Sequence, residues 1–200
     1  MKRKILSFII VFVSFSTMIF ALDGGIKVPS SLYKVDDFYR NIEMYHTERG
    51  VSTLTTVWGY IIFTNVYYRN NAKSCWLVFD LNSDTENAET GFNSVMFYGQ
   101  NESNRVVLNI NSTTDREKLF TDSDATIHLR KLKHIVRRQH RLSDNEINSL
   151  IGLIEDNKFE INVRFVNRNN YYPLNKKDFN KRQARDLYNL LKFYRDIKEK

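Results

Sequence analysis

The sequence predicts a single α+β domain, in which a mainly antiparallel sheet of about six or seven strands is combined with helices. Between Val51 and Asn111, β-branched and aromatic runs are separated by turn residues, which is the pattern of successive strands. The connections between these runs are too short for the crossovers that parallel strands require. The length of 200 residues accommodates one ordinary domain, and the chain contains no internal repeat.

Residues 1–21 have the layout of a secretory signal peptide. Lys2-Arg3-Lys4 is a short cationic start, Ile5–Phe20 is an apolar run, and Ala21 is a small residue suited to cleavage. The apolar run is shorter than the roughly 20 residues of a membrane-spanning helix. Ile19 is bulky for a position close to a cleavage point, which leaves an uncleaved anchor as the alternative. We expect an exported protein with no transmembrane domain after cleavage.

The single cysteine, Cys75, excludes an intrachain disulfide. It lies in an apolar run that reads as a buried strand, where cysteine acts as a small hydrophobe. An exported protein without disulfides fits a bacterial envelope better than a eukaryotic extracellular space. We therefore expect the protein in the periplasm or at the cell surface of a bacterium.

Positive charge is concentrated in the stretch His128–Arg141, which holds six Lys or Arg residues, three of the four histidines and no acid. Removal of residues 1–21 takes away three positive charges and no negative one, so the net charge falls from +7 to +4. Because the stretch alone carries +6, the rest of the mature chain lies near −2. The basic character is therefore local.

The N-terminal part is expected to begin with an extended lead-in at residues 22–34, followed by the domain at residues 35–200. An N-terminal helix is predicted because apolar residues share one helical face. These residues are Val35, Phe38, Tyr39, Ile42 and Tyr45.

Strands are expected at residues 51–57, 58–69, 74–81, 92–98 and 105–111. Gly59 indicates a bulge within its strand. Residues 111–124 are expected to form a polar connection, and residues 125–128 a short edge strand. One face of the sheet is expected to be aromatic and buried, with contributions from Trp58, Phe63, Trp76, Phe79 and Phe97.

The basic stretch predicts a helix near residues 129–141. At about 100° per residue, its apolar side chains share one arc and its cations occupy the opposite arc. Strand alternation gives no such separation, since Leu129 would share a face with Lys131 and Lys133.

The last part of the chain carries the clearest local signal. Ser143-x-x-Glu146 is a capping box, which satisfies two donors at the start of a helix. After that helix the apolar period changes to two, which indicates strands. We expect a helix near residues 143–157, a late hairpin at residues 158–174 and a C-terminal helix that begins at Asn175 or Asp178.

The histidines do not predict a metal site. His128, His134 and His140 recur at intervals that would place them about 9 Å apart on different helix faces, or about 20 Å apart on a strand. Neither spacing closes a chelate with metal–nitrogen distances near 2 Å. We expect no metal and no cofactor.

The segment Asp80–Glu86 begins like a calcium-binding loop, with oxygen ligands at alternate positions. Thr85 then stands where the required glycine belongs, and Gly91 stands where the bidentate glutamate belongs. An acidic hairpin loop is the simpler interpretation.

No catalytic residue can be nominated from the sequence. It contains no Gly-x-Ser-x-Gly, no His-Glu-x-x-His and no glycine-rich phosphate loop. The two helices expected around Leu142-Ser143 resemble a helix-turn-helix in outline, but the turn lacks glycine and the export signal directs the chain away from the chromosome. DNA is therefore not an expected partner.

The leading hypothesis is a non-enzymatic binding or interaction protein whose basic helix faces an anionic polymer, a lipid headgroup or another envelope protein. One alternative is a structural or subunit protein whose basic face is merely solvated. Another is an enzyme whose site is assembled from distant residues. The expected anion-facing set consists of Arg130, Lys131, Lys133, Arg137, Arg138 and Arg141.

Overall fold

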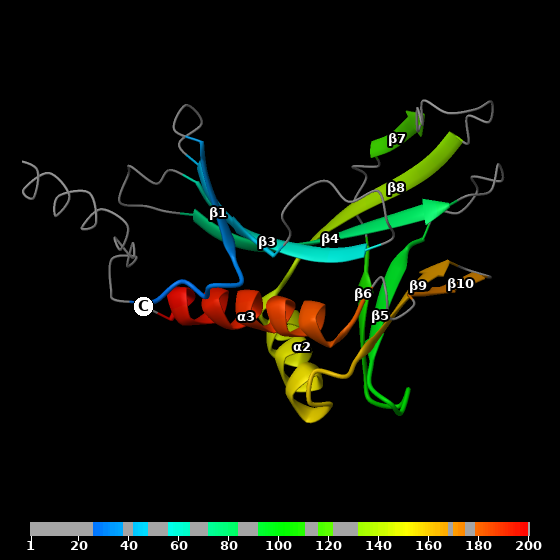
Figure 1. The fold of residues 1–200 in the computed structure, drawn as a ribbon. Coiled ribbons are helices and arrows are strands. Elements are labelled where there is room, and N and C mark those ends of the chain that lie inside the picture. The colour runs from blue at the N-terminus through cyan, green and yellow to red at the C-terminus, as the bar shows by residue number, and fades with distance from the viewer. Residues whose placement is uncertain are drawn as a thin grey trace, which may run out of the picture.

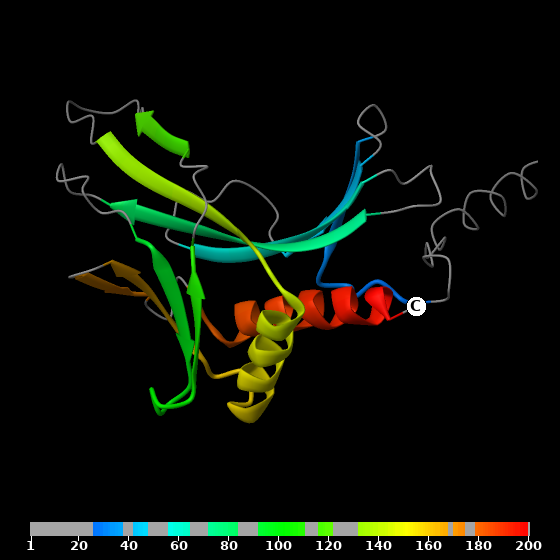
Figure 2. The ribbon, with the colours of Figure 1, turned by 180° about the vertical axis from the view of Figure 1, so that it is seen from behind.

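The described part of the chain forms a single α+β domain with two antiparallel sheets and two helices (Figures 1 and 2), so the predicted fold class is confirmed. The predicted signal peptide at residues 1–21 lies outside the described residues. Neither described helix combines the length and the apolar character that crossing a membrane requires. The computed structural model describes residues 26–37, 42–47, 56–64, 72–83, 92–110, 116–121, 132–167, 170–174 and 179–199.

The larger sheet has six strands in the order β1-β2-β3-β4-β8-β7, and all neighbours are antiparallel. Helix α3 (Lys181–Lys198) lies along one face of this sheet. Both ends of the sheet curve away from α3, so the opposite face is concave (Figures 1 and 2). The strands are β1 (Tyr33–Asp37), β2 (Ile42–His46), β3 (Thr56–Thr64), β4 (Ala72–Ser83), β7 (Arg116–Thr121) and β8 (Leu132–Arg141).

The smaller sheet has four strands in the order β10-β9-β5-β6, and it shares one hydrophobic core with the larger sheet. Phe79 of β4 packs against Phe97 of β5 and Phe165 of β9, with ring centroids 6.4 Å and 6.1 Å away. The predicted late hairpin is confirmed as β9 and β10. The strands are β5 (Ser94–Tyr98), β6 (Arg105–Asn109), β9 (Asn162–Asn167) and β10 (Asn170–Pro173).

The predicted capping box begins helix α2 (Asp144–Asp156). The backbone N–H of Glu146 donates to Ser143 Oγ, and the backbone N–H of Ser143 donates to Glu146 Oε2. Helix α3 is confirmed, but Asn180 caps it, so it starts later than the predicted Asn175 or Asp178. α2 packs against α3 and β6, which places both helices on the same side of the larger sheet.

Gly59 does not form the predicted bulge. β3 pairs with β4 residue by residue along its whole length. A Cβ atom at Gly59 would lie 2.5 Å from Leu190 Cδ2 and 3.0 Å from Leu77 Cδ2. Glycine occupies this position because α3 approaches the strand too closely for a side chain.

The predicted helix from Val35 to Tyr45 is wrong over the described residues, which form strands β1 and β2 instead. Strand alternation buries Tyr45, which is 1% exposed and packs edge-on against Phe63 and Phe193. Lys34, on the same face, forms ion pairs with Asp36 and Glu43. The apolar spacing was compatible with a helix, but pairing with β3 decided in favour of strands.

The predicted helix at 129–141 is also wrong over residues 132–141, which form β8. β8 pairs with β4 on one side and with β7 on the other, and these long-range hydrogen bonds override the local helical period. β7 also replaces part of the polar connection predicted at 111–124. The edge strand predicted at 125–128 lies outside the described residues.

The expected aromatic face is divided between the two sides of the larger sheet. Phe63, Phe79 and Phe97 belong to the core, as predicted. Trp58 and Trp76 are only partly buried and alternate with the core residues of their strands. They therefore point to the concave face, away from α3.

Candidate ligand-binding face

A row of side chains crosses five neighbouring strands of the larger sheet. The register places Tyr33 opposite His46, and His46 opposite Tyr60. Tyr60 is opposite Trp76, and Trp76 is opposite Arg141. Because neighbouring strands lie about 4.8 Å apart, the row extends over roughly 19 Å. We call these five residues the cross-strand row.

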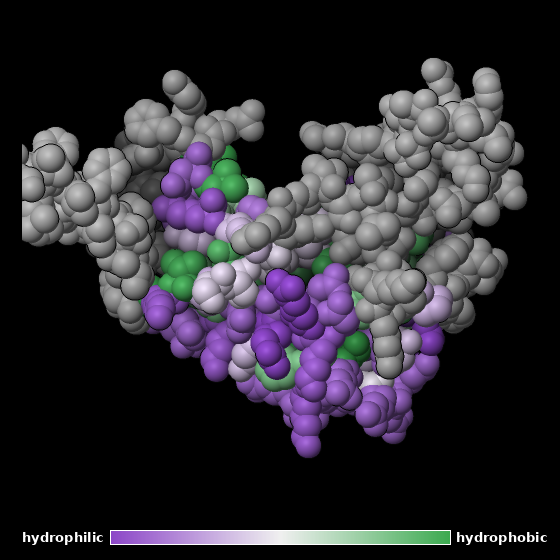
Figure 3. All heavy atoms as spheres, viewed as in Figure 1, coloured by the Kyte–Doolittle hydropathy of each residue, from purple (hydrophilic) through white to green (hydrophobic). Residues whose placement is uncertain are grey.

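The cross-strand row lies on the concave face. Ile61, Cys75 and Leu77, which alternate with its members, are fully buried on the side of α3. The pKa of the Cys75 thiol is raised by burial, as expected for a structural cysteine. The four rings of the row are half-buried, and Arg141 is exposed. In Figure 3, hydrophilic side chains gather over the helices in the lower part of the view, and hydrophilic, paler and hydrophobic side chains are mixed above them.

The rings of the row provide flat surfaces. Tyr60 and Trp76 are nearly parallel, with an interplanar angle of 7° and ring centroids 6.2 Å apart. Tyr33 and His46 lie 5.6 Å apart at 41°. Trp58, beside the row on β3, lies 5.8 Å from Tyr60. Half-exposed rings of this kind offer apolar faces with polar edges to a ligand.

Hydrogen bonds hold the edges of these rings. The hydroxyl of Tyr60 donates to Gln139 Oε1 at 3.2 Å, and Trp76 Nε1 donates to Ser74 Oγ at 2.9 Å. Burial raises the pKa of the Tyr60 hydroxyl, which therefore stays protonated as a donor. Because their orientations are fixed in advance, the rings lose little freedom when a ligand stacks on them.

Next to the row, a buried ion pair crosses from β4 to β8. Asp80 is fully buried and accepts from Arg137 Nε at 2.6 Å and from Arg137 Nη2 at 2.9 Å. Trp58 Nε1 also donates to Asp80, at 3.2 Å, and the Arg137 guanidinium lies 5.9 Å from the Trp58 ring. The charge of Arg137 is therefore offset by Asp80, and its first role is structural.

The described members of the predicted anion-facing set do not share one face. Alternation along β8 places Arg137 and Arg141 on the concave face and Arg138 on the other, where its guanidinium lies 5.3 Å from the Phe92 ring. Lys133 belongs to β8, but the structure does not describe its side chain. Arg130 and Lys131 lie outside the described residues. Of the predicted set, Arg141 is the exposed cation that adjoins the aromatic rings.

The histidines of the basic stretch are not brought together over the part that the structure describes. His140 Nε2 donates to Glu146 Oε1 at 2.9 Å, which links the end of β8 to the first turn of α2. His134 lies in β8 and His128 lies outside the described residues. Among the described residues, no group of three or more His, Cys, Asp or Glu side chains is arranged to hold a metal ion.

Sequence reasoning did not identify the cross-strand row. The alternation of Trp58 and Tyr60 was visible, as was the single tryptophan of the next strand. Tyr33 and His46 carried no such signal, because Tyr33 lay in the expected extended lead-in and His46 directly followed the predicted helix. Comparison of the chain with protein-family models, with curated proteins and with solved structures found no match.

Proposed function

We propose that the protein is a non-enzymatic binding protein of a bacterial envelope, and that it binds an anionic glycan on the concave face of its larger sheet. The observation that carries this proposal is the cross-strand row, in which four rings on neighbouring strands lead to an exposed arginine. A binding role and an anionic partner are also what the sequence predicts, but the proposed site is a face of the larger sheet and not a basic helix.

Stacking supports a sugar as the ligand. The face of an aromatic ring is electron-rich, so it attracts the weakly positive C–H groups on the face of a sugar ring. Tyr60 and Trp76 stack on each other with their planes 7° from parallel, and both side chains are only half-buried, so part of each ring can meet a sugar. Their polar neighbours, Gln139 and Ser74, lie at the ring edges, where sugar hydroxyl groups would find hydrogen-bonding partners.

Charge supports an acidic glycan. Arg141 is exposed at one end of the row, and a guanidinium group binds a carboxylate with two parallel hydrogen bonds. Outside residues 128–141 the mature sequence has a net charge near −2, which argues against an attraction to polyanions spread over the whole surface. Recognition would therefore combine ring stacking with one or a few local charge contacts.

The expected location of the protein in the cell envelope favours a glycan over single-stranded nucleic acid. Nucleic-acid bases also stack on aromatic rings, so the rings alone do not distinguish the two ligands. The layout of residues 1–21 favours export to the envelope, where glycans are abundant and nucleic acid is scarce. Nucleic-acid binding also relies on several phosphate contacts, whereas Arg141 is the exposed cation of the row.

The test is a titration of the purified protein with three hexameric probes: oligogalacturonate, neutral cellohexaose and oligo(dT). Calorimetry gives the affinities, and tryptophan emission reports stacking because both tryptophans lie on the concave face. We expect oligogalacturonate to bind most tightly. The variant Trp76→Leu should weaken that binding by about 5- to 160-fold, if a sugar stacked on the ring contributes the about 1–3 kcal/mol of a stacked base.

Two further variants make the test specific. Arg141→Gln should weaken binding of oligogalacturonate but leave any binding of cellohexaose unchanged. Tyr98→Leu, which removes a half-buried ring from the smaller sheet, serves as the matched control and should bind like the wild type. Tighter binding of oligo(dT) than of both glycans, or equal affinities of Trp76→Leu and the wild type, would overturn the proposal.

A further inference from the structure

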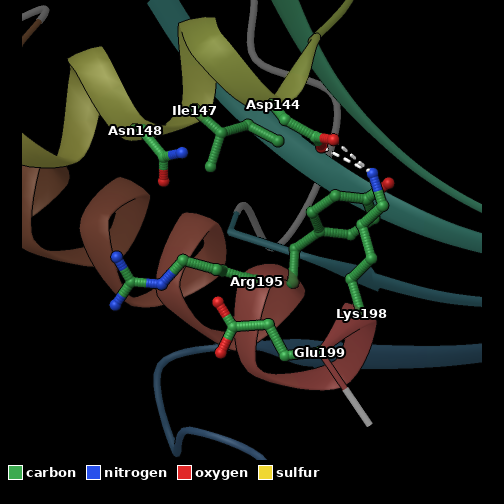
Figure 4. A pocket seen from close by; sticks show the side chains of 7 residues that line it. Asp144, Ile147, Asn148, Arg195, Lys198 and Glu199 are labelled. Carbon is green, nitrogen blue, oxygen red and sulfur yellow. Dashed lines mark hydrogen bonds and ion pairs between the residues drawn. The ribbon is translucent and has the colours of Figure 1, made fainter.

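A second hollow lies on the other side of the molecule, between the first turn of α2 and the last turns of α3 (Figure 4). Its volume is about 310 Å³, and its apolar wall is formed by Ile147 and Tyr194. At its edge, Lys198 Nζ forms an ion pair with both carboxylate oxygens of Asp144, at 2.5 Å and 2.6 Å. This ion pair connects the two helices beside the hollow.

Two further charges line the same hollow. Arg195 lies in the last turn of α3, and Glu199 is the residue that caps the end of this helix, four residues farther along the chain (Figure 4). Within the described part of the chain, neither side chain has an ion-pair or hydrogen-bond partner. Asp144 and Lys198, by contrast, satisfy each other. The lining therefore offers one cation and one anion, neither paired with a described residue, next to an apolar wall.

We infer that this hollow binds a small zwitterion, a free amino acid or dipeptide with an apolar side chain. The carboxylate of the ligand would bind Arg195, its ammonium group would bind Glu199, and its side chain would lie against Ile147 and Tyr194. Ligand pockets begin at about 300 Å³, so the volume suits a molecule of this size. This inference is independent of the proposed glycan-binding face, which lies across the larger sheet.

The charge balance of the lining argues against simpler ligands. A lone anion would meet the carboxylates of Asp144 and Glu199, and a lone cation would meet Arg195 and Lys198. A ligand that carries both charges avoids both repulsions. An uncharged apolar ligand would leave Arg195 and Glu199 unpaired, and it would also cover part of their hydration.

The experiment compares the dipeptide Ala-Leu with its acetylated form, which lacks the ammonium group, and its amidated form, which lacks the carboxylate. Binding to the purified protein is measured by ligand-observed NMR and calorimetry. We expect Ala-Leu to bind, and each blocked form to bind at least about fivefold more weakly. Equal binding of all three forms, or no binding of Ala-Leu at millimolar concentration, would refute the inference.

Charge-removing variants locate the site. Arg195→Gln should weaken binding of Ala-Leu about as much as amidation does, and it should have no further effect on the amidated form. Glu199→Gln should behave in the same way with the acetylated form. The control is Arg182→Gln, the same change at an exposed position of α3 outside the hollow, which should leave binding unaltered. Unchanged binding in both pocket variants would place the site elsewhere.

Discussion

The buried carboxylate of Asp80 connects Arg137 and Trp58 to the centre of the larger sheet. Breaking a buried ion pair leaves one charge without its partner, which costs about 3–5 kcal/mol. Removing both charges avoids that cost. Replacing only Asp80 or only Arg137 should therefore cost more stability than the intact pair contributes.

We predict that Arg137→Met lowers the free energy of unfolding by about 3–5 kcal/mol, because the Asp80 carboxylate is left unpaired. The double variant Asp80→Asn/Arg137→Met should recover most of this loss, since Asn retains an acceptor for Trp58 Nε1. Urea unfolding measures both changes. A double variant that is no more stable than Arg137→Met would contradict the account.

Gly59 shows how a single position is determined by an element far away in the sequence. A methyl group there would lie 2.5 Å from the end of the Leu190 side chain on α3. Leu190 is fully buried and has little room to move. The residue type in β3 is therefore set by the packing of the last helix.

Gly59→Ala should lower the free energy of unfolding by about 1–3 kcal/mol, the usual cost of overpacking a core. The matched control is Gly152→Ala in α2, where an added Cβ meets nothing within 4 Å. That change should raise stability by about 0.5–1 kcal/mol, since alanine favours a helix interior more than glycine does. Chemical denaturation of both variants tests the contrast, and a loss of stability in both would indicate a general intolerance of substitution.

Among the elements, α2 is attached to β8 through the carboxylate of Glu146. This group accepts from Ser143 Oγ, from the Ser143 backbone and from His140 Nε2. Burial alone would raise the pKa of Glu146, but these hydrogen bonds outweigh burial, so the pKa lies below its ordinary value of 4.5. The charged form of Glu146 is thus favoured in the folded state.

This direction of the pKa shift fixes the expected response to acid. A carboxylate whose pKa is lowered by folding stabilises the protein at pH values above its pKa in the unfolded chain. That contribution is lost as the pH falls through its pKa in the folded protein. The difference in unfolding free energy between wild type and Glu146→Gln should therefore be largest above about pH 5 and shrink below pH 4.5. Glu160→Gln, at an exposed ion pair with Lys181, should show a much smaller effect. Denaturation curves from pH 3 to pH 7 measure both differences.

Elements with local signals were predictable from the sequence, and elements decided by pairing were not. The capping box at Ser143 fixed the start of α2, and the alternation after it gave the late hairpin. The segments 35–45 and 129–141 had helical periods, but in the structure their described residues complete the larger sheet at β1, β2 and β8. A strand's partners lie far away in sequence, so periodicity could not reveal them.

For the molecule as a whole, the shared core joins both sheets and both helices. Phe79, Phe92, Phe97 and Phe165 interlock across the two sheets, with the rings of Phe92 and Phe165 stacked 4.6 Å apart. Separate unfolding of either sheet would expose this cluster. The two sheets should therefore unfold together.

Two optical probes can test this cooperativity. Tryptophan emission reports on the larger sheet alone, because Trp58 and Trp76 are the two tryptophans of the chain. Far-UV circular dichroism near 222 nm reports chiefly on helices, which among the described residues are α2 and α3. We predict coincident midpoints for the two signals in urea, as expected for a two-state transition. Midpoints that differ would show that the larger sheet unfolds as a separate unit.

The candidate binding face could be predicted only in part. Arg141 was identified from the basic stretch, but its neighbours in the row come from four other strands. Their assembly depends on the register of each strand pair, and a shift of one residue would turn a side chain to the opposite face. For the same reason, the single face expected for the basic residues is wrong for Arg137 and Arg138, which alternation along β8 places on opposite faces.

The direction of the cross-strand row also has a consequence for the geometry of any bound polymer. The row runs across the strands, so a polymer that follows it meets a new strand about every 4.8 Å. A chain whose repeat equals two such steps, roughly 10 Å, presents the same group to every second strand. A chain whose repeat is not a whole number of such steps loses its register with the strands after a few repeats. A polymer bound as proposed would therefore be selected by the length of its repeat as well as by its chemistry.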